Sequence, residues 1–282
     1  MCYNLANPLF VHEYDIQLTI GFLIIFGGLG FPILFNFWTF FKQVIIGHYL
    51  LRKRTHAVWI INLNTRIIGL TTLYLILFGT VGYYVMEYNN VLKDFDGVGK
   101  WVTSFFASAT ARTAGYNTIN YAQLTFPAII LSYFLMWVGA SPASTGGGIK
   151  TSTFAVSIMN SLSIARGKKH IEAFGREITD ITVKRAYSQI FLSIIAIGAS
   201  ITLVSLFDGA VPLRSVIFEC ISAFGTVGLS IGINADLTPA SKLVLILTMY
   251  VKRVNLLTLM AAMVKQVKYQ NYKYPSEDIP IN

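Results

Sequence analysis

Long apolar runs recur along this 282-residue chain and constrain its fold more than any other feature. The most regular runs occupy residues 16–41, 67–86, 186–207 and 239–264. A helix needs about 20 apolar residues to cross the hydrocarbon core of a bilayer, and each run is long enough. Charged residues make up only 12% of the chain, roughly half of their share in soluble domains. The predicted fold class is therefore an all-α polytopic membrane protein.

Positive charges gather in a few connecting segments, which predicts the orientation of the chain. The net charge of +9 would suggest a nucleic-acid partner in a soluble protein. Cytoplasmic loops of membrane proteins are rich in Lys and Arg, so orientation explains the charge better and no nucleic-acid partner is expected. The basic segments are 42–66, 166–185 and 265–273. This pattern predicts about five spans in the plasma (inner) membrane, with the N-terminus outside and the C-terminus cytoplasmic.

Two further apolar segments are too short to cross a bilayer, and each ends in Thr-x-Gly with an apolar middle residue. They lie within residues 101–117 and 212–230. Irregular backbone is tolerated at membrane depth only where protein or water covers it. A segment that enters the membrane and returns, with its carbonyls facing a pore, meets that condition. We interpret both segments as re-entrant ion-selectivity loops.

These two segments belong to an internal repeat. A shift of 113 residues aligns Phe105 with Phe218 in the loops, and Met136 with Met249 in the helices that follow. Each unit is a helix, a re-entrant loop and a helix, and such repeats indicate pseudo-symmetric assembly around a shared site. Two units cannot enclose a pore by themselves. The first span resembles the closing helix of another unit. Pro32 suggests a kink within this span.

The third span starts near Leu124, and a Gly-rich segment, residues 139–148, interrupts it before the helical pattern resumes over residues 149–164. Its proline and its three consecutive glycines, Gly146, Gly147 and Gly148, disfavour a regular helix. The following Lys150 invites comparison with a phosphate-binding loop. That motif requires a glycine directly before the lysine and a strand before the loop, so a nucleotide site is not predicted here.

Three stretches together resemble the Trk/Ktr/HKT superfamily of potassium transporters, and most closely its Ktr-type bacterial membrane subunit. They are residues 111–118, 139–151 and 222–230. The resemblance covers nearly the whole chain and implies four helix–pore loop–helix units around one pore. This chain would then hold the end of the second unit with a cytoplasmic loop (1–56), the third unit (57–177), and the fourth unit with a cytoplasmic tail (178–282). The first two filter loops would be absent.

The candidate ion site consists of backbone carbonyls in the two re-entrant loops. Carbonyl oxygens can replace the hydration shell of K⁺, and glycine allows the backbone to bring them to the pore axis. No covalently bound cofactor is expected, and Na⁺ is kept as an alternative ion. The candidate ion-binding residues are Thr113, Ala114, Gly115, Thr226, Val227 and Gly228.

The resemblance implies a gate below this filter. Gly146, Gly147 and Gly148 would form a movable loop that obstructs the pore. Arg253, far from the ends of the last span, should face water or a partner inside the pore. It would repel cations and pair with carbonyls of the loop. Lys252 and Asn255 stand where the family usually has glycine. Because two adjacent charges on a helix are not expected to face the pore together, Lys252 should snorkel or pack at an interface.

Two other charged residues lie beside the loops. Glu219 could bind filter amides or attract cations, and a structural cap within the loop is an equal alternative. Arg112 is expected to pair with a carboxylate or with loop backbone in a structural role. The two cysteines, Cys2 and Cys220, lie far apart and the four histidines are scattered, so neither a disulfide framework nor a metal cluster follows.

The predicted function is potassium uptake through a carbonyl-lined filter that an intramembrane Gly-rich loop gates, with Na⁺ coupling left open. The alternative is a structural or other-substrate transport subunit of a membrane complex, inactive alone because two filter units are missing. An enzyme is not predicted, since no polar constellation of His, Asp or Ser is found at membrane depth. The resemblance also implies a homodimer and a cytoplasmic nucleotide-binding regulatory ring, with lipid around the spans.

Overall fold

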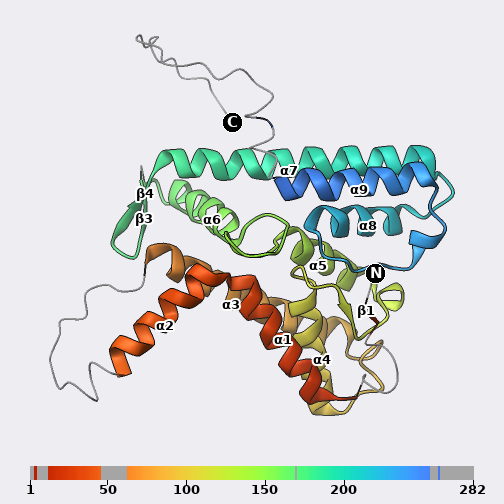
Figure 1. Cartoon of the computed structure of the whole chain (residues 1–282), viewed down its shortest axis with the longest axis horizontal. Coiled ribbons are helices and arrows are strands. Elements are labelled where there is room, and N and C mark those ends of the chain that lie inside the picture. The colour runs from red at the N-terminus through yellow and green to blue at the C-terminus, as the bar shows by residue number, and fades with distance from the viewer. Residues whose placement is uncertain (1–2, 5–11, 46–61, 169, 255–259, 261–282) are drawn as a thin grey trace, which may run out of the picture.

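The computed structural model shows a helical bundle with two very small sheets (Figure 1). It describes residues 3–4, 12–45, 62–168, 170–254 and 260. The helices are α1 (Tyr14–Leu29), α2 (Phe31–Ile45), α3 (Leu63–Glu87), α4 (Gly97–Thr110), α5 (Phe126–Trp137), α6 (Thr151–Ala165), α7 (Asp180–Phe207), α8 (Leu213–Gly225) and α9 (Pro239–Val254). The strands are β1 (Tyr3–Asn4), β2 (Tyr116–Asn117), β3 (Ile171–Ala173) and β4 (Arg176–Ile178). The predicted all-α class is confirmed.

Among the described residues, two helices are long and apolar enough to cross a membrane, α3 and α7. The pair α1 and α2 passes the same test, and α5 is a shorter apolar helix. The described part therefore contains fewer uninterrupted spans than the sequence predicts. One reason is that the Gly-rich segment divides the third predicted span between α5 and α6. The last predicted span is described as far as Val254, and beyond that residue the structure describes only Met260.

The first predicted span is not a single kinked helix. Gly30, with a φ of 81°, separates α1 from α2, and the two helices are bent by 100° (Figure 1). The kink predicted at Pro32 is wrong in position, because Pro32 lies in the first turn of α2, where a missing N–H costs nothing. A Cβ on Gly30 would lie 3.0 Å from the Ala143 carbonyl oxygen, so the bend packs against the Gly-rich segment.

Equivalent positions of the repeat meet each other directly. Strand β1 pairs in parallel with β2, which places Tyr3 opposite Tyr116. The Ser141 N–H donates a 3.0 Å hydrogen bond to the Gly28 carbonyl. Both pairs are separated by 113 residues, the length of the repeat. Residues that contact their own equivalents indicate units arranged about a common axis.

A carboxylate caps the start of α5 and another caps the start of α9, the two helices that follow the Thr-x-Gly loops. Glu87, at the end of α3, accepts hydrogen bonds from the Thr125 N–H at 2.8 Å and from its Oγ1 at 2.6 Å, just before α5. Asp208, which follows α7, accepts from the Thr238 N–H at 3.1 Å and from its Oγ1 at 3.0 Å, just before α9. These bonds satisfy N–H groups that a helix start leaves unpaired. They fix where α5 begins relative to α3 and where α9 begins relative to α7.

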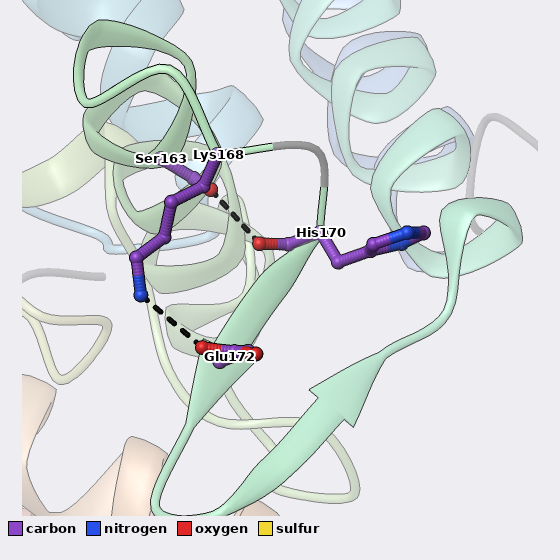
Figure 2. Close-up of polar contacts among 4 residues, drawn as sticks. All are labelled: Ser163, Lys168, His170 and Glu172. Atoms are coloured by element: carbon purple, nitrogen blue, oxygen red, sulfur yellow. Dashed lines mark hydrogen bonds and ion pairs between the residues drawn. The ribbon is translucent and has the colours of Figure 1, made fainter.

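A short antiparallel hairpin of β3 and β4 connects α6 with α7 in the basic segment, where the sequence predicts only a loop. The Ser163 hydroxyl donates to the His170 carbonyl at 3.1 Å, and Lys168 forms a 3.1 Å ion pair with Glu172 (Figure 2). Ile171 and Ile178 are buried against α3, α6 and α7. This apolar contact, more than the exposed ion pair, anchors the hairpin to the bundle.

Candidate functional site

Both predicted re-entrant segments consist of a short helix followed by an irregular loop. Helix α4 has 14 residues and α8 has 13, so neither can cross a bilayer. The first Thr-x-Gly loop (Thr113, Ala114, Gly115) follows α4, and the second (Thr226, Val227, Gly228) follows α8. The positions predicted from the apolar pattern are therefore confirmed for both helices. Each helix directs its C-terminal end, which carries partial negative charge, toward its loop.

The two loops share an unusual backbone conformation at equivalent positions. The φ angles are 75° at Thr113, 74° at Gly115, 50° at Thr226 and 91° at Gly228. Positive φ is ordinary for glycine, but a β-branched threonine adopts it only under constraint. Strained backbone that the surrounding structure maintains is found preferentially at functional sites. The repeat of the same strain in both units marks these loops as the candidate site.

The loops contact each other through their glycines. A Cβ on Gly115 would collide with the Val227 carbonyl oxygen and would lie 3.2 Å from the Gly228 Cα. In each loop, a side-chain hydroxyl group of the preceding helix also donates a hydrogen bond to the carbonyl of the residue that follows the glycine. Ser222 Oγ donates to the Leu229 carbonyl at 2.6 Å, and Thr110 Oγ1 donates to the Tyr116 carbonyl at 2.9 Å. The structure thus brings the six candidate ion-binding residues into one place.

The Gly-rich segment lies directly against both loops. The two residues that flank it, Val138 and Ile149, form an isolated parallel β-bridge, so its two ends lie side by side. A Cβ on Gly146 would collide with Thr113 Oγ1, and one on Gly147 would collide with Thr226 Oγ1. Glycines are therefore required for this close approach. Two of the three predicted gate glycines touch the two loops predicted to form the filter.

Three basic side chains surround the Gly-rich segment. Arg253 Nη1 donates to the Thr145 carbonyl at 2.8 Å, and Lys150 Nζ donates to the Gly146 carbonyl at 2.7 Å. The expected pairing of Arg253 with carbonyls of this segment is therefore present in the structure. All three basic residues, including Lys252, line a cavity of about 190 Å³ together with Thr226.

The sequence predicts that Lys252 and Arg253 do not face the pore together and that Lys252 snorkels or packs at an interface. Both line the cavity below the second Thr-x-Gly loop, because long basic side chains can curve around a helix. The Lys252 ammonium lies 4.8 Å from the centroid of the Phe224 ring in α8, within the range of a cation–π interaction. Asn255, the other predicted departure from the family pattern, lies outside the described residues.

Glu219 has the contacts of a structural cap. Its carboxylate accepts hydrogen bonds from the Ser230 hydroxyl, from the Ile231 N–H at 3.1 Å and from Asn234 Nδ2 at 3.1 Å. These partners follow the second Thr-x-Gly loop, so the carboxylate closes the return of the chain toward α9. Of the two roles weighed for Glu219, the geometry favours the cap.

Arg112 pairs with backbone, one of its two expected partners. Its Nη2 donates to the Gly139 carbonyl at 3.1 Å and its Nη1 lies 3.5 Å from the Thr72 carbonyl. Sequence reasoning did not identify Thr72, because nothing in an apolar helix distinguishes one threonine from its neighbours.

Comparison with known proteins adds independent evidence. A family model described as TrkH, cation transport protein, matches residues 8–273. The Ktr system potassium uptake protein B of Vibrio alginolyticus is 36% identical over 272 residues, which are 96% of this chain and 56% of that protein. The potassium/sodium uptake protein NtpJ of Enterococcus hirae is 34% identical over 98% of this chain and 59% of its own length.

A solved structure shares the fold. The crystal structure of the potassium transporter TrkH from Vibrio parahaemolyticus superimposes with a TM-score of 0.69 at 14% identity, over 89% of this chain and 52% of that one. The chain thus spans between about half and three fifths of the length of the relatives it matches.

Proposed function

Because the chain belongs to the TrkH family of cation transport proteins, we propose that it forms part of a potassium-uptake pathway across the plasma (inner) membrane. The observation that carries this proposal is the contact between the two Thr-x-Gly loops, which have the same strained backbone at equivalent positions. The names of the relatives, which specify potassium or potassium and sodium, support K⁺ as the ion, with Na⁺ as a coupled or competing ion.

In this proposal K⁺ exchanges its water for backbone oxygens of the loops. Thr113, Ala114, Thr226 and Val227 supply carbonyls, and the two glycines allow the close approach. The C-terminal ends of α4 and α8 add partial negative charge near the ion. An inside-negative potential drives the ion inward with about 2.3 kcal/mol per 100 mV. The chain contributes the third and fourth units of the pathway, together with the closing helix of another unit.

The Gly-rich segment is the gate of this pathway. Its glycines lie against Thr113 and Thr226, so it occupies the space that an ion leaving the loops must enter. Arg253 holds the segment through the Thr145 carbonyl and repels cations from the closed gate. Opening requires the segment to leave both threonines, and three consecutive glycines give the backbone that freedom.

The wider assembly follows from the same family membership. The apolar side chains that α7 exposes, such as Phe191, Ile194 and Leu206, suit lipid or a second copy in a homodimer. A cytoplasmic nucleotide-binding ring regulates the gate through the basic segments, and the C-terminus lies in the cytoplasm. These assignments are parts of the proposal.

Growth at low external potassium tests the function. The full-length protein is expressed in cells that lack their own uptake systems, with membrane insertion checked by blotting. Restored growth, together with Rb⁺ uptake that unlabelled K⁺ inhibits, would support the proposal. If the inserted protein restores neither, the potassium function is wrong. Uptake that follows an organic solute instead of any alkali cation would favour a different transported substrate.

A further inference from the structure

Arg112 is a buried cation without an ion-pair partner among the described residues. Its side chain is 7% exposed, and a buried charge is unfavourable unless hydrogen bonds compensate it. The bond to the Gly139 carbonyl is good at 3.1 Å, but the 3.5 Å separation from the Thr72 carbonyl is long. In the part of the chain that the structure describes, Arg112 Nε has no hydrogen-bond partner.

Thr72 presents a second unsatisfied group at the same place. It is 5% exposed, and its Oγ1 also has no partner among the described residues. Other threonines of α3 behave differently. Thr71 Oγ1 donates to the Ile67 carbonyl and Thr80 Oγ1 to the Ile76 carbonyl, each at 2.7 Å. Because Thr72 does not bond back to its own helix, its hydroxyl remains available to a ligand.

A small cavity joins these two groups. It has a volume of about 10 Å³, and Arg112 and Thr72 are the polar side chains in a lining that is otherwise apolar or glycine. A space of roughly 10–15 Å³ is the smallest that holds one water molecule, and such a water needs about two to four polar partners. Larger ions do not fit this space without rearrangement.

We propose that this cavity binds a single water molecule between Arg112 Nε and Thr72 Oγ1, and that Arg112 is thereby a positioning residue for the gate. The water oxygen accepts a hydrogen bond from Arg112 Nε–H. It forms a second hydrogen bond with the Thr72 hydroxyl, in which either group can donate. Arg112 directly precedes the first Thr-x-Gly loop, and its Nη2 holds Gly139, the first residue of the Gly-rich segment. One side chain therefore sets the distance between the loop and the base of the segment, with α3 as the support.

The effect on transport rests on the proposed function, whereas the water site does not. The test uses the purified full-length protein and two conservative substitutions on α3. Thr72→Val removes the hydroxyl and keeps the shape of the side chain. Thr71→Val is the matched control, since its hydroxyl bonds only to its own helix. Arg112→Lys keeps the charge and loses the planar fork.

Two readouts are needed. A density map that resolves ordered water should show a peak within hydrogen-bond distance of Arg112 Nε and Thr72 Oγ1, and Thr72→Val should abolish it. In liposomes, Thr72→Val and Arg112→Lys should raise the K⁺ leak of the closed state roughly fivefold to tenfold. Thr71→Val should leave both the density peak and the K⁺ leak unchanged. A leak that is unaffected by Thr72→Val and Arg112→Lys would overturn the positioning role.

The remaining outcomes are also decisive. A map without a peak, or an anomalous bromide signal in the cavity after exchange of chloride for bromide, would overturn the water site. If the wild-type protein moves no K⁺ at all, the proposed function fails, and the density still decides whether the water is there.

Discussion

A side chain at Gly115 would collide with the carbonyl oxygen of Val227, a residue of the other Thr-x-Gly loop. Val227 lies one position before Gly228, the equivalent of Gly115 in the repeat. Two segments far apart in sequence therefore share one narrow space, and the first loop leaves room for the Val227 carbonyl by lacking a side chain at Gly115.

Replacement of Gly115 with Ala should abolish most potassium uptake. The methyl group would displace the Val227 carbonyl, and the φ of 74° adds roughly 1–2 kcal/mol of strain. Rb⁺ uptake measures the effect. Gly97→Ala is a suitable control, because Gly97 has open space around it at the start of α4. Equal losses in both variants would indicate general misfolding, and normal uptake in Gly115→Ala would contradict the contact.

Replacement of Gly228 with Ser should change selectivity more than folding. The nearest atom to a Cβ at this position is the Gly115 Cα at 3.8 Å, so space is available and only the φ of 91° is unfavourable. We expect expression to be maintained while the ratio of K⁺ to Na⁺ flux falls. Unchanged flux ratios would contradict a role of Gly228 in ion selection.

Replacement of Gly147 with Ala should raise the leak of the closed state. The added methyl group would collide with Thr226 Oγ1 and would lie 2.9 Å from the Gly225 carbonyl carbon, so the Gly-rich segment must move away from the second loop. Ion flux into liposomes that contain the protein in its closed state measures the leak. Gly198→Ala, in an open position of α7, provides the control. Deletion of Gly146 to Gly148 should have a larger effect in the same direction.

Replacement of Arg253 with Gln should also raise the leak, by about tenfold or more, because a full positive charge and a hydrogen bond to Thr145 are lost. Lys252→Met should have a smaller effect, since Lys252 lines the same cavity but interacts with the Phe224 ring. The double variant tests whether the two charges act together, because residues that share one cavity give non-additive effects. A leak that stays at the wild-type level in all three variants would argue against an electrostatic gate.

Asp208 should make the stability of the packing between α7 and α9 sensitive to acid. Hydrogen bonds from Ser241 and Thr238 lower the pKa of its carboxyl below the ordinary value of 3.8. A lowered pKa in the folded state means that the stabilisation is present above the ordinary value and is lost as the pH falls through the lowered one.

Thermal unfolding measured against pH checks this prediction. Asp208→Asn should lower the unfolding midpoint at neutral pH, and the difference from the wild type should shrink below pH 3.8. Asp236→Asn, in the connection between α8 and α9 that also contains Thr238, serves as the control. A difference that persists unchanged in acid would refute the role of the charge.

The positions of the helices were accessible from sequence, because length and apolar character decide whether a segment can cross a bilayer. The short helices α4 and α8 and the long helices α3 and α7 all lie where the apolar pattern predicts them. The sequence places the bend after α1 at Pro32 instead of Gly30, since a proline within the first turn of a helix looks the same in sequence as one that breaks it. The hairpin of β3 and β4 is not predictable from local pattern, because its burial depends on contacts with α3, α6 and α7.

By itself, the sequence determined the membrane class, the repeat of 113 residues and the positions of the two Thr-x-Gly loops, since all three depend on local composition and spacing. Only the tertiary structure decided which residues meet across the repeat. Lys252 faces the same cavity as Arg253, Glu219 closes a return loop, and Thr72 shares a small cavity with Arg112. The physical reason is that side-chain direction and close packing of glycine backbones arise from contacts between distant segments, which local pattern does not encode.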